Sequence, residues 1–226
     1  MSKFRTLNNP TPPAAGPGRL IVIAAPSGAG KTTLVRGLMR LHPELQFSIS
    51  FTTRPPRATE VPGRDYHFVS QETFETMLAA NAFLEHASVF DHYYGTSRQQ
   101  VAELLAAGRS VILEIDWQGA RQVRRQMPEC RSVFILPPSV AELKRRLVSR
   151  GTDTPAVIER RFRDALSDMS HWREFDYAVI NAELPAATAE LAAIALDAPG
   201  NSASRTDNAA LQQRVAAIFA EAAETR

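Results

Sequence analysis

The sequence predicts an α/β fold built on a central, mainly parallel sheet of five strands. Short apolar runs are continuous rather than alternating, which is typical of parallel strands covered on both faces. Helical patterns separate these runs. The 226 residues, 44% of them hydrophobic and 22% charged, suffice for one full core and exclude a disordered chain. The expected strands are Leu20–Ala25, Phe47–Phe51, Val111–Asp116, Ser132–Leu136 and Tyr177–Asn181.

Capping residues and leucine spacing locate the helices of this core. Leucines at three- to four-residue spacing predict a helix that follows Lys31. A second helix is expected between Ser97, a good N-cap, and Gly108, a good residue to follow a helix. The capping box Ser139–Glu142 predicts the start of a third.

Three segments depart from the alternation of strands and helices. Residues 1–19 contain four prolines and no apolar periodicity, which predicts a disordered tail. Residues 52–97 hold a long polar loop and one amphipathic helix, so we expect an inserted lobe. Residues 197–226 are interpreted as a linker and a C-terminal helix. The domain at 20–196 then has its core at 20–51, 98–141 and 164–196, with a basic helix–loop–helix segment at 142–163.

Charge and cysteine content narrow the functional classes. The 26 Lys and Arg residues against 24 Asp and Glu give a net charge of +2, which does not indicate binding to nucleic acid. No apolar run approaches the roughly 18 residues of a membrane span, so no membrane association is expected. The single Cys130 cannot form an internal disulfide, and we expect a reducing, cytoplasmic location. Whether the chain is a monomer or a homo-oligomer stays open.

A glycine-rich segment follows the first predicted strand and leads into the first helix. Its glycines let backbone N–H groups turn around an anion, and the helix N-terminus adds partial positive charge. Lys31 can reach the β- and γ-phosphates of a nucleotide, and the Thr32 hydroxyl can bind Mg²⁺. Ala25 replaces the first glycine of the usual pattern, at a position that needs only a small residue. The alternative is a plain glycine-rich turn with an exposed lysine. The expected phosphate-binding residues are Pro26, Ser27, Gly28, Ala29, Gly30, Lys31, Thr32 and Thr33.

Four further segments resemble those of bacterial guanylate kinases. They are FSISFTTRPPRATEVPGRDY at 47–66, FLEHASVFDHYYGTS at 83–97, LEIDWQGA at 113–120 and LKRRLVSRGTD at 143–153. The resemblance spans about residues 19–196 and implies a three-layer P-loop fold with a GMP-binding lobe at 52–97 and a helical lid at 142–163. It implies transfer of the γ-phosphoryl group of ATP to GMP, with Mg²⁺ as cofactor and ADP and GDP as products, in purine nucleotide metabolism and GMP recycling.

The resemblance assigns the phosphate of GMP to one loop of the lobe. In guanylate kinases the serine and two arginines of S-x-T-T-R-x-P-R hold this phosphate, and here they are Ser50, Arg54 and Arg57. Two guanidinium groups on a proline-stiffened loop suit a dianionic phosphate. Without the neighbouring motifs, a solvated basic loop would be an equal alternative. Tyr66 and Tyr94 match the two tyrosines that the family adds as neutral donors.

Glu85 and Thr96 match the residues that distinguish guanine in the family. Guanine presents N1–H and N2–H₂ side by side, which fit the two oxygens of a carboxylate, whereas adenine presents an acceptor there. A lone glutamate is more often a surface residue, and the flanking motifs favour base recognition. Glu114 and Asp116 match an acidic pair near guanine and the metal. Asp116 is the better candidate for direct contact, and a supporting role is open for Glu114.

The resemblance also implies a lid that covers ATP. Its arginines, which touch the ATP phosphates and the transferred group, match Arg146, Arg150 and Arg161. Together with Lys31 they are the expected catalytic residues. A solvated face is the alternative for the other cations of this charge run. Thr154 and Pro155 are an N-cap and a first helical residue, so they predict the second lid helix.

The resemblance also implies an adenine contact, and two other functions are possible alternatives. Asn181 matches the family's adenine contact, although Ala182 follows where the family often has aspartate. A non-catalytic guanylate-kinase-like interaction module is one rival, but such modules would be expected to lose the phosphate-loop lysine or lid arginines. A kinase for another nucleoside monophosphate is the other rival, and Glu85 with Thr96 argues against it.

Overall fold

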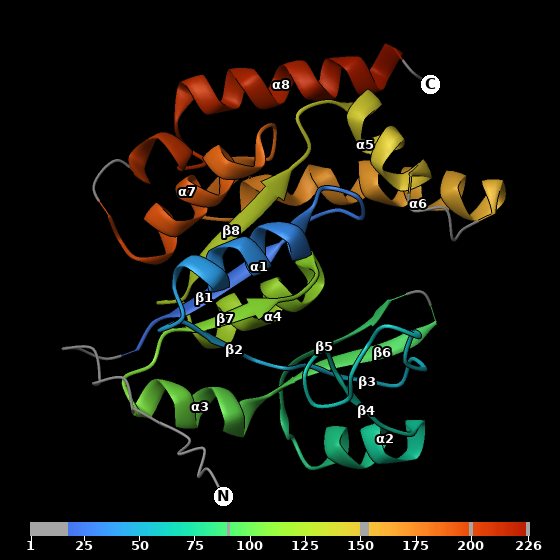
Figure 1. The fold of residues 1–226 in the computed structure, drawn as a ribbon, viewed down its shortest axis with the longest axis vertical. Coiled ribbons are helices and arrows are strands. Elements are labelled where there is room, and N and C mark those ends of the chain that lie inside the picture. The colour runs from blue at the N-terminus through green and yellow to red at the C-terminus, as the bar shows by residue number, and fades with distance from the viewer. Residues whose placement is uncertain (1–17, 90, 150–153, 199–200, 225–226) are drawn as a thin grey trace, which may run out of the picture.

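A computed structural model describes residues 18–89, 91–149, 154–198 and 201–224. At its centre lies a sheet of five strands, all parallel, which confirms the predicted α/β architecture (Figure 1). Most of the predicted tail, 1–17, lies outside the described residues. The strands are β1 (Leu20–Ala24), β2 (Gln46–Phe47), β7 (Val111–Glu114), β8 (Arg131–Leu136) and β9 (Tyr177–Ile180), in the spatial order β2–β7–β1–β8–β9.

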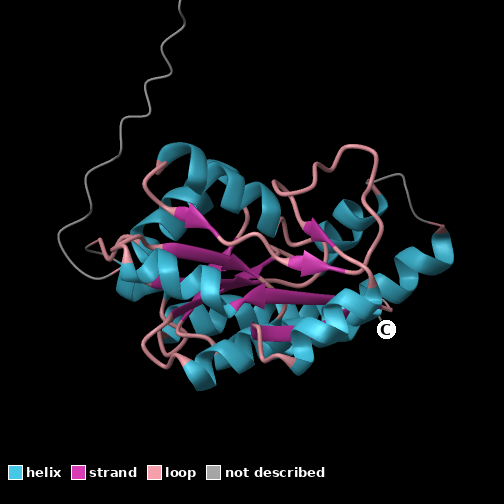
Figure 2. Ribbon diagram, turned by 90° about the horizontal axis from the view of Figure 1, so that it is seen from below, coloured by secondary structure: helices cyan, strands magenta, loops and turns pink. Residues whose placement is uncertain are grey.

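Helices cover both faces of this sheet and make a three-layer fold (Figure 2). Side chains of β1 alternate between the layers, because Ile21 and Ile23 face one helical layer while Leu20 and Val22 face the other. One layer consists of α1 (Lys31–Leu41) and α7 (Leu184–Ala195). The other contains α3 (Arg98–Ala106), α4 (Trp117–Gln126), α5 (Val140–Val148), α6 (Pro155–Met169), the 3₁₀ helix η1 (Ser170–Glu174) and α8 (Ala209–Glu224).

The predicted strand Phe47–Phe51 is wrong in its extent. Only Gln46 and Phe47 pair with β7, and the chain then leaves the central sheet. Phe51 begins a strand of a second sheet, where its ring packs 4.7 Å from that of His67 and 5.9 Å from that of Phe83. One predicted strand therefore contributes residues to two sheets, which a pattern of hydrophobicity alone does not reveal.

The inserted segment folds as a small sheet with a helix packed against it (Figure 1). The sequence predicted its helix but not this four-stranded sheet, most of which is antiparallel. Phe74 is buried and stacks on Phe83 and Tyr93, at 4.5 and 5.5 Å between ring centroids. The elements are β3 (Phe51–Thr52), β4 (His67–Phe68), α2 (Gln71–Ala79), β5 (Phe83–Val89) and β6 (His92–Ser97), with the strands in the order β4–β3–β6–β5.

The predicted N-cap residues are confirmed, although Glu142 does not complete the capping box predicted at Ser139. The hydroxyl of Ser97 accepts the N–H of Gln100 in α3. Thr154 caps α6, whose first residue is Pro155. Ser139 caps α5.

The C-terminal segment packs on the core rather than extending from it. The Thr206 hydroxyl donates to the Phe175 carbonyl at 2.6 Å, after the short 3₁₀ helix η2 (Asn201–Ser204). In α8, Leu211, Val215 and Ile218 are buried against the core. None of the helices in the described part of the chain combines the length and apolarity that crossing a bilayer needs.

Candidate active site

The phosphate-binding loop joins β1 to α1 with two glycines in the left-handed region. Gly28 and Gly30 have φ of 90° and 92°, which residues with a side chain rarely adopt. Leu143 and Leu147 of α5 lie about 3.0 Å from the position that a Cβ on Gly28 would take. The loop therefore needs glycine both for its own turn and for the close approach of α5.

Neighbouring strands bring acidic and basic groups to this loop. β1 and β7 pair in parallel, so the residues after each strand meet at one edge of the sheet. There Lys31 Nζ donates to the Ile115 carbonyl at 2.7 Å. The Thr32 hydroxyl donates to a carboxylate oxygen of Glu114. The predicted loop residues and Glu114 thus form one cluster.

Glu85 of β5 is buried, with 3% of its surface exposed. The Thr96 hydroxyl donates to its Oε1 at 2.5 Å. The pKa of Glu85 is raised to about 7, mainly by burial and with a contribution from the nearby charge of Asp116, while the Thr96 hydrogen bond opposes the rise. Asp116 itself is the N-cap of α4 and accepts the Gly119 N–H at 2.7 Å. The structure thus gathers three of the residues expected around the base.

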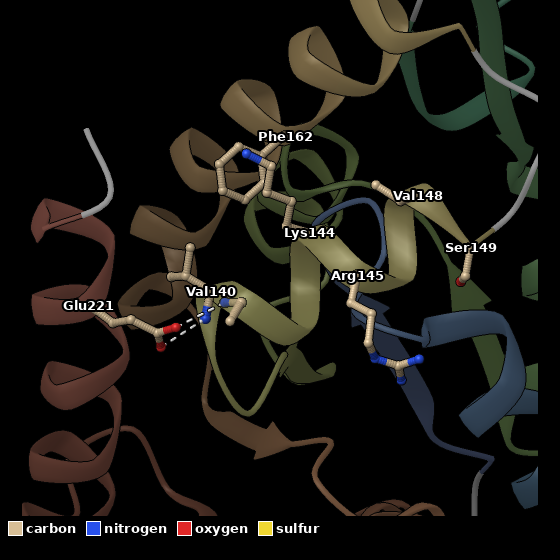
Figure 3. Close-up of a pocket in the computed structure, with 8 residues that line it drawn as sticks. Val140, Lys144, Arg145, Val148, Ser149, Phe162 and Glu221 are labelled. Atoms are coloured by element: carbon tan, nitrogen blue, oxygen red, sulfur yellow. Dashed lines mark hydrogen bonds between the residues drawn. The ribbon is translucent and has the colours of Figure 1, made fainter.

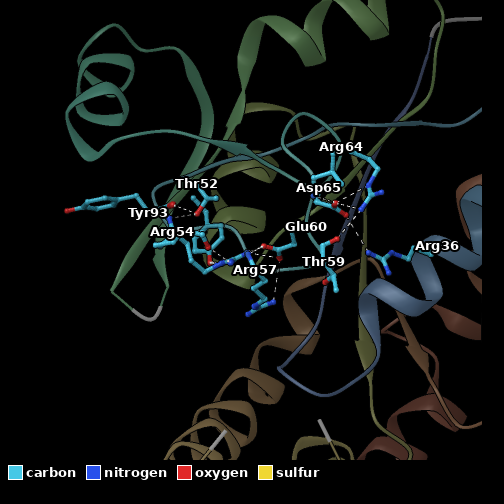
Figure 4. A network of polar contacts seen from close by, with 12 residues as sticks. Arg36, Thr52, Arg54, Arg57, Thr59, Glu60, Arg64, Asp65 and Tyr93 are labelled. Atoms are coloured by element: carbon cyan, nitrogen blue, oxygen red, sulfur yellow. Dashed lines mark hydrogen bonds and ion pairs between the residues drawn. The ribbon is translucent and has the colours of Figure 1, made fainter. Parts of the chain in front are cut away.

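The loop expected to hold the acceptor phosphate contains a network of ion pairs (Figure 4). Arg54 Nη2 lies 2.8 and 2.9 Å from the two carboxylate oxygens of Glu60, and Arg54 Nε donates to the Tyr94 hydroxyl at 3.3 Å. Arg57 is 70% exposed and reaches only to 3.7 Å from the same carboxylate. The Tyr66 pKa is raised to about 12, first by burial and then by the charge of Glu114, so this phenol is a neutral donor.

A cavity of about 990 Å³ separates this loop from α1. Arg57, Ser50 and Tyr66 line it from the lobe, while Thr32 and Glu114 line it from the core. Arg54 lies behind this lining, bound to Glu60, and Glu85, Tyr94, Thr96 and Asp116 do not line it either. The cavity therefore unites residues expected to bind the acceptor phosphate with Thr32 of the phosphate loop, whereas Glu85 and Thr96, expected to recognise the base, are buried and do not line it.

The lid arginines that the structure describes contact the phosphate loop. Arg146 donates to the carbonyls of Ala29 and Asn181, at 3.2 and 3.0 Å. The Asn181 side-chain amide donates to the same Ala29 carbonyl at 2.8 Å. Arg161 donates to the Ser27 hydroxyl at 2.7 Å. The third predicted lid arginine, Arg150, lies outside the described residues.

Comparisons with known proteins give the family. The family described as Guanylate kinase matches residues 17–198. A protein of Alkalilimnicola ehrlichii named guanylate kinase is 56% identical over 178 residues, which are 79% of this chain and 88% of the relative. The chain belongs to the guanylate kinase family. A guanylate kinase of Dechloromonas aromatica is 53% identical over 200 residues, covering 88% of this chain and 98% of the relative.

A solved structure of the guanylate kinase family supports the fold. The crystal structure of guanylate kinase from Anaplasma phagocytophilum has a TM-score of 0.68 and 28% identity, over 90% of this chain and 96% of that one. The three-layer P-loop architecture predicted from the sequence is therefore the observed one.

Two residues of this guanylate kinase site were missed by the sequence analysis. Glu60 holds the Arg54 guanidinium and also accepts the Arg57 backbone N–H at 2.8 Å. Gly119 lies in α4 against Glu85: a Cβ there would overlap Glu85 Oε2 and lie 3.2 Å from Asp116 Oδ1. The spacing of Arg57 and Glu60, three residues apart in a polar loop, is a weak signal for the first. For Gly119 there was no such signal, because the sequence did not predict α4.

Proposed function

We propose that this chain transfers the γ-phosphoryl group of ATP to GMP, giving ADP and GDP. One observation carries the proposal: a phosphate-binding loop and a buried carboxylate suited to guanine converge at the residues that follow β7. Lys31 contacts Ile115, and the next residue, Asp116, lies near Glu85. The phosphates of ATP and the base of GMP would thus bind on either side of the same short segment, Ile115 and Asp116.

Guanine recognition in this proposal rests on Glu85 and Thr96. The ionised carboxylate accepts N1–H and N2–H₂ of guanine, and Thr96 holds the carboxylate in orientation. Because the site is buried, a base that offers an acceptor in place of N1–H leaves polar groups unpaired, which is costly. Asp116 supports this arrangement as the cap of α4, next to Glu85.

The acceptor phosphate would bind at the cavity beneath the lobe. Arg57 is exposed there and can turn toward a dianion. Ser50 and Tyr66 line the same cavity with hydroxyl donors. Arg54 and Tyr94 would reach this phosphate from behind, with Glu60 fixing the guanidinium. Charge-assisted bonds from two arginines suit a phosphate monoester.

The ATP phosphates would lie in the loop at 26–33, under the lid at 142–163. Lys31 neutralises charge on the β- and γ-phosphates, and Arg146 and Arg161 approach the same loop from the lid. Asn181, bonded to Ala29, borders the loop where adenine is expected. Arg150 belongs to the same proposal. Lid closure excludes water, which would otherwise hydrolyse ATP.

The residues around Thr32 fit a magnesium ion. A hydroxyl and a carboxylate, Thr32 and Glu114, are hydrogen-bonded to each other at the phosphate loop, and oxygen donors are the ligands that Mg²⁺ prefers. We propose that Thr32 holds Mg²⁺ together with the ATP phosphates, with Glu114 beside it. When bound, the ion neutralises charge on the phosphate oxygens.

We propose the cytoplasm as the location, with the reaction serving purine nucleotide metabolism and GMP recycling.

Cys130 is buried, and burial raises its thiol pKa to about 11, so the thiol has no evident part in the reaction.

A coupled assay with MgATP and GMP, AMP, CMP or UMP tests the proposed function. We expect turnover with GMP to exceed that with each other monophosphate by at least about a hundredfold in kcat/KM. Turnover that favours another base would overturn the substrate, and GMP binding without ADP formation would indicate a binding module instead.

GMP affinity should depend on pH around neutrality. The raised pKa of Glu85, about 7, means that lowering the pH protonates the carboxyl and removes the acceptor for guanine. We expect kcat/KM for GMP to fall toward tenfold per pH unit below pH 7 and to level off above it. The profile is measured from pH 5.5 to 8.5, with KM for ATP as the internal comparison. A flat GMP profile would contradict the prediction.

Replacing Gly119 with alanine should weaken GMP use without weakening the helix. Alanine favours a helix over glycine by about 1 kcal/mol, yet its Cβ would overlap the Glu85 carboxylate. We expect kcat/KM for GMP to fall about ten- to a hundredfold, with Tm close to that of wild type, because the cost of the overlap at this buried position opposes the gain in helix propensity. Gln118→Ala, at the exposed neighbouring position of α4, is the control. Equal activity of the two variants would remove Gly119 from base recognition.

A further inference from the structure

The C-terminal helix α8 lies beyond residue 198, where the family match ends. It packs on the helical layer that contains α5 (Figure 1). Leu211, Val215 and Ile218 of α8 belong to the same apolar cluster as Leu143 and Leu147 of α5. Those two leucines contact the phosphate loop at Gly28. Packing therefore connects a segment outside the family match to the proposed ATP site.

Glu221 of α8 binds the first turn of α5 (Figure 3). Its carboxylate oxygens accept the backbone N–H groups of Val140 and Ala141, at 3.0 and 2.9 Å. The next N–H, that of Glu142, is bonded to the Ser139 hydroxyl at 3.0 Å. Since the first N–H groups of a helix lack partners within it, α8 supplies two of the acceptors that α5 needs.

Glu142, in the same turn of α5, binds two neighbouring arginines. In a capping box the glutamate at the third helical position turns back to the cap residue. Here Glu142 instead accepts hydrogen bonds from Arg145, at 2.6 and 2.7 Å, and from Arg146 Nε at 2.7 Å. Arg146 in turn donates to Ala29 in the phosphate loop. A continuous chain of polar contacts runs from α5 to this loop.

We propose that Glu221 is a positioning residue for the ATP site. By accepting the N–H groups of Val140 and Ala141 it fixes the turn of α5 from which Glu142 orients Arg146 against the phosphate loop. Without Glu221 these two N–H groups lose their acceptors, and a shift of this turn would move Glu142 and release Arg146. A cavity of about 590 Å³, lined by α5, α6 and Glu221, lies beside this contact, so α5 has room to shift. The inference rests on the proposed function, because it concerns how ATP binds.

Glu221→Gln is the test variant, because glutamine has one acceptor oxygen for two N–H groups. We expect KM for ATP to rise about three- to tenfold, the effect of losing a helix cap, with KM for GMP within twofold. Glu129→Gln, the same change at an exposed residue after α4, is the control and should leave both constants unchanged. If wild-type enzyme shows no ATP- and GMP-dependent turnover, the proposed function fails; if it is active and the variant equals it, this inference fails.

A double variant tests whether Glu221 acts through Glu142. In Glu142→Gln enzyme, adding Glu221→Gln should raise KM for ATP by less than twofold, because the two changes act on one chain of contacts. A full additional effect would overturn the path. Equal rises in both Michaelis constants would indicate general destabilisation and overturn the positioning role. Should Glu221→Gln lose its folded circular dichroism spectrum, Glu221→Asp, which keeps the charge, replaces it under the same criteria.

Discussion

Replacing Lys31 with alanine should lower kcat for GDP formation by about a thousandfold, while the dissociation constant of GMP stays within about twofold. A preorganised donor aimed at developing charge contributes on the order of 10²–10³ to a rate, and here it would act on the transferred phosphoryl group. Lys31 Nζ is held by the Ile115 carbonyl at 2.7 Å, so the charge is positioned before ATP binds. Single-turnover kinetics with saturating GMP measure the effect, and calorimetry measures GMP binding.

Lys144→Ala is the matched control for this lysine. Lys144 lies on the outer side of α5, with its ammonium 5.2 Å from the centre of the Phe162 ring, and its removal should change kcat by less than threefold. Tm of both variants shows whether the fold persists. Loss of GMP binding with retained turnover in Lys31→Ala would contradict the roles proposed for the two halves of the site.

The strands of the core could be predicted because burial on both faces leaves a local signature. Ser132–Leu136 and Tyr177–Asn181 agree with β8 and β9 to within one residue at each end. Phe47–Phe51 could not be assigned in this way, since its residues, FSISF, alternate between apolar and polar and only its tertiary partners divide it between two sheets. The short strands of the lobe pair with other strands of the same inserted segment, and the sequence of one strand does not identify its partner.

Some residues of the candidate site could also be predicted from local sequence, whereas the roles of others depend on the fold. Lys31 and Thr32 are recognisable from a local motif whose chemistry follows from spacing. Asp116 was expected to contact ligand, and the structure shows it capping α4, a role that its position just before a helix could have indicated. Glu60 acts through two arginines of the same irregular loop, and Gly119 acts through the absence of a side chain against Glu85. Such roles become visible only when the neighbours are in place.

The Glu221 contact is the extreme case. It joins Glu221, in a helix beyond the family match, to Val140 and Ala141, which precede it by 81 and 80 residues. The capping box at Ser139 was predicted, and half of it forms. The other half does not, because Glu142 binds Arg145 and Arg146 instead, while α8 brings a second carboxylate to the next two N–H groups of the turn. Local rules give the options for a side chain, and long-range packing selects among them.

Glu85→Gln should lower kcat/KM for GMP by about a thousandfold and reduce the preference for GMP over AMP by at least about a hundredfold. The amide has one acceptor where guanine presents two donors, and its NH₂ group would oppose one of them.

The same Glu85→Gln change should stabilise the free enzyme at alkaline pH. Because the folded pKa of Glu85, about 7, exceeds the usual 4.5, the folded state holds this proton more tightly. The wild-type free energy of unfolding therefore falls as pH rises from about 4.5 to 7.

Glutamine carries no titrating proton, so the variant should lack this part of the pH dependence. We expect Tm of Glu85→Gln to exceed that of wild type at pH 8 and to approach it at pH 5. Glu103→Gln, on the exposed side of α3, should change neither selectivity nor the pH dependence of Tm. Since activity falls while stability at pH 8 rises, unfolding cannot account for the loss of GMP use. Unchanged selectivity in Glu85→Gln would remove this carboxylate from base recognition, because a buried group that reads two donors of guanine cannot lose an acceptor without consequence.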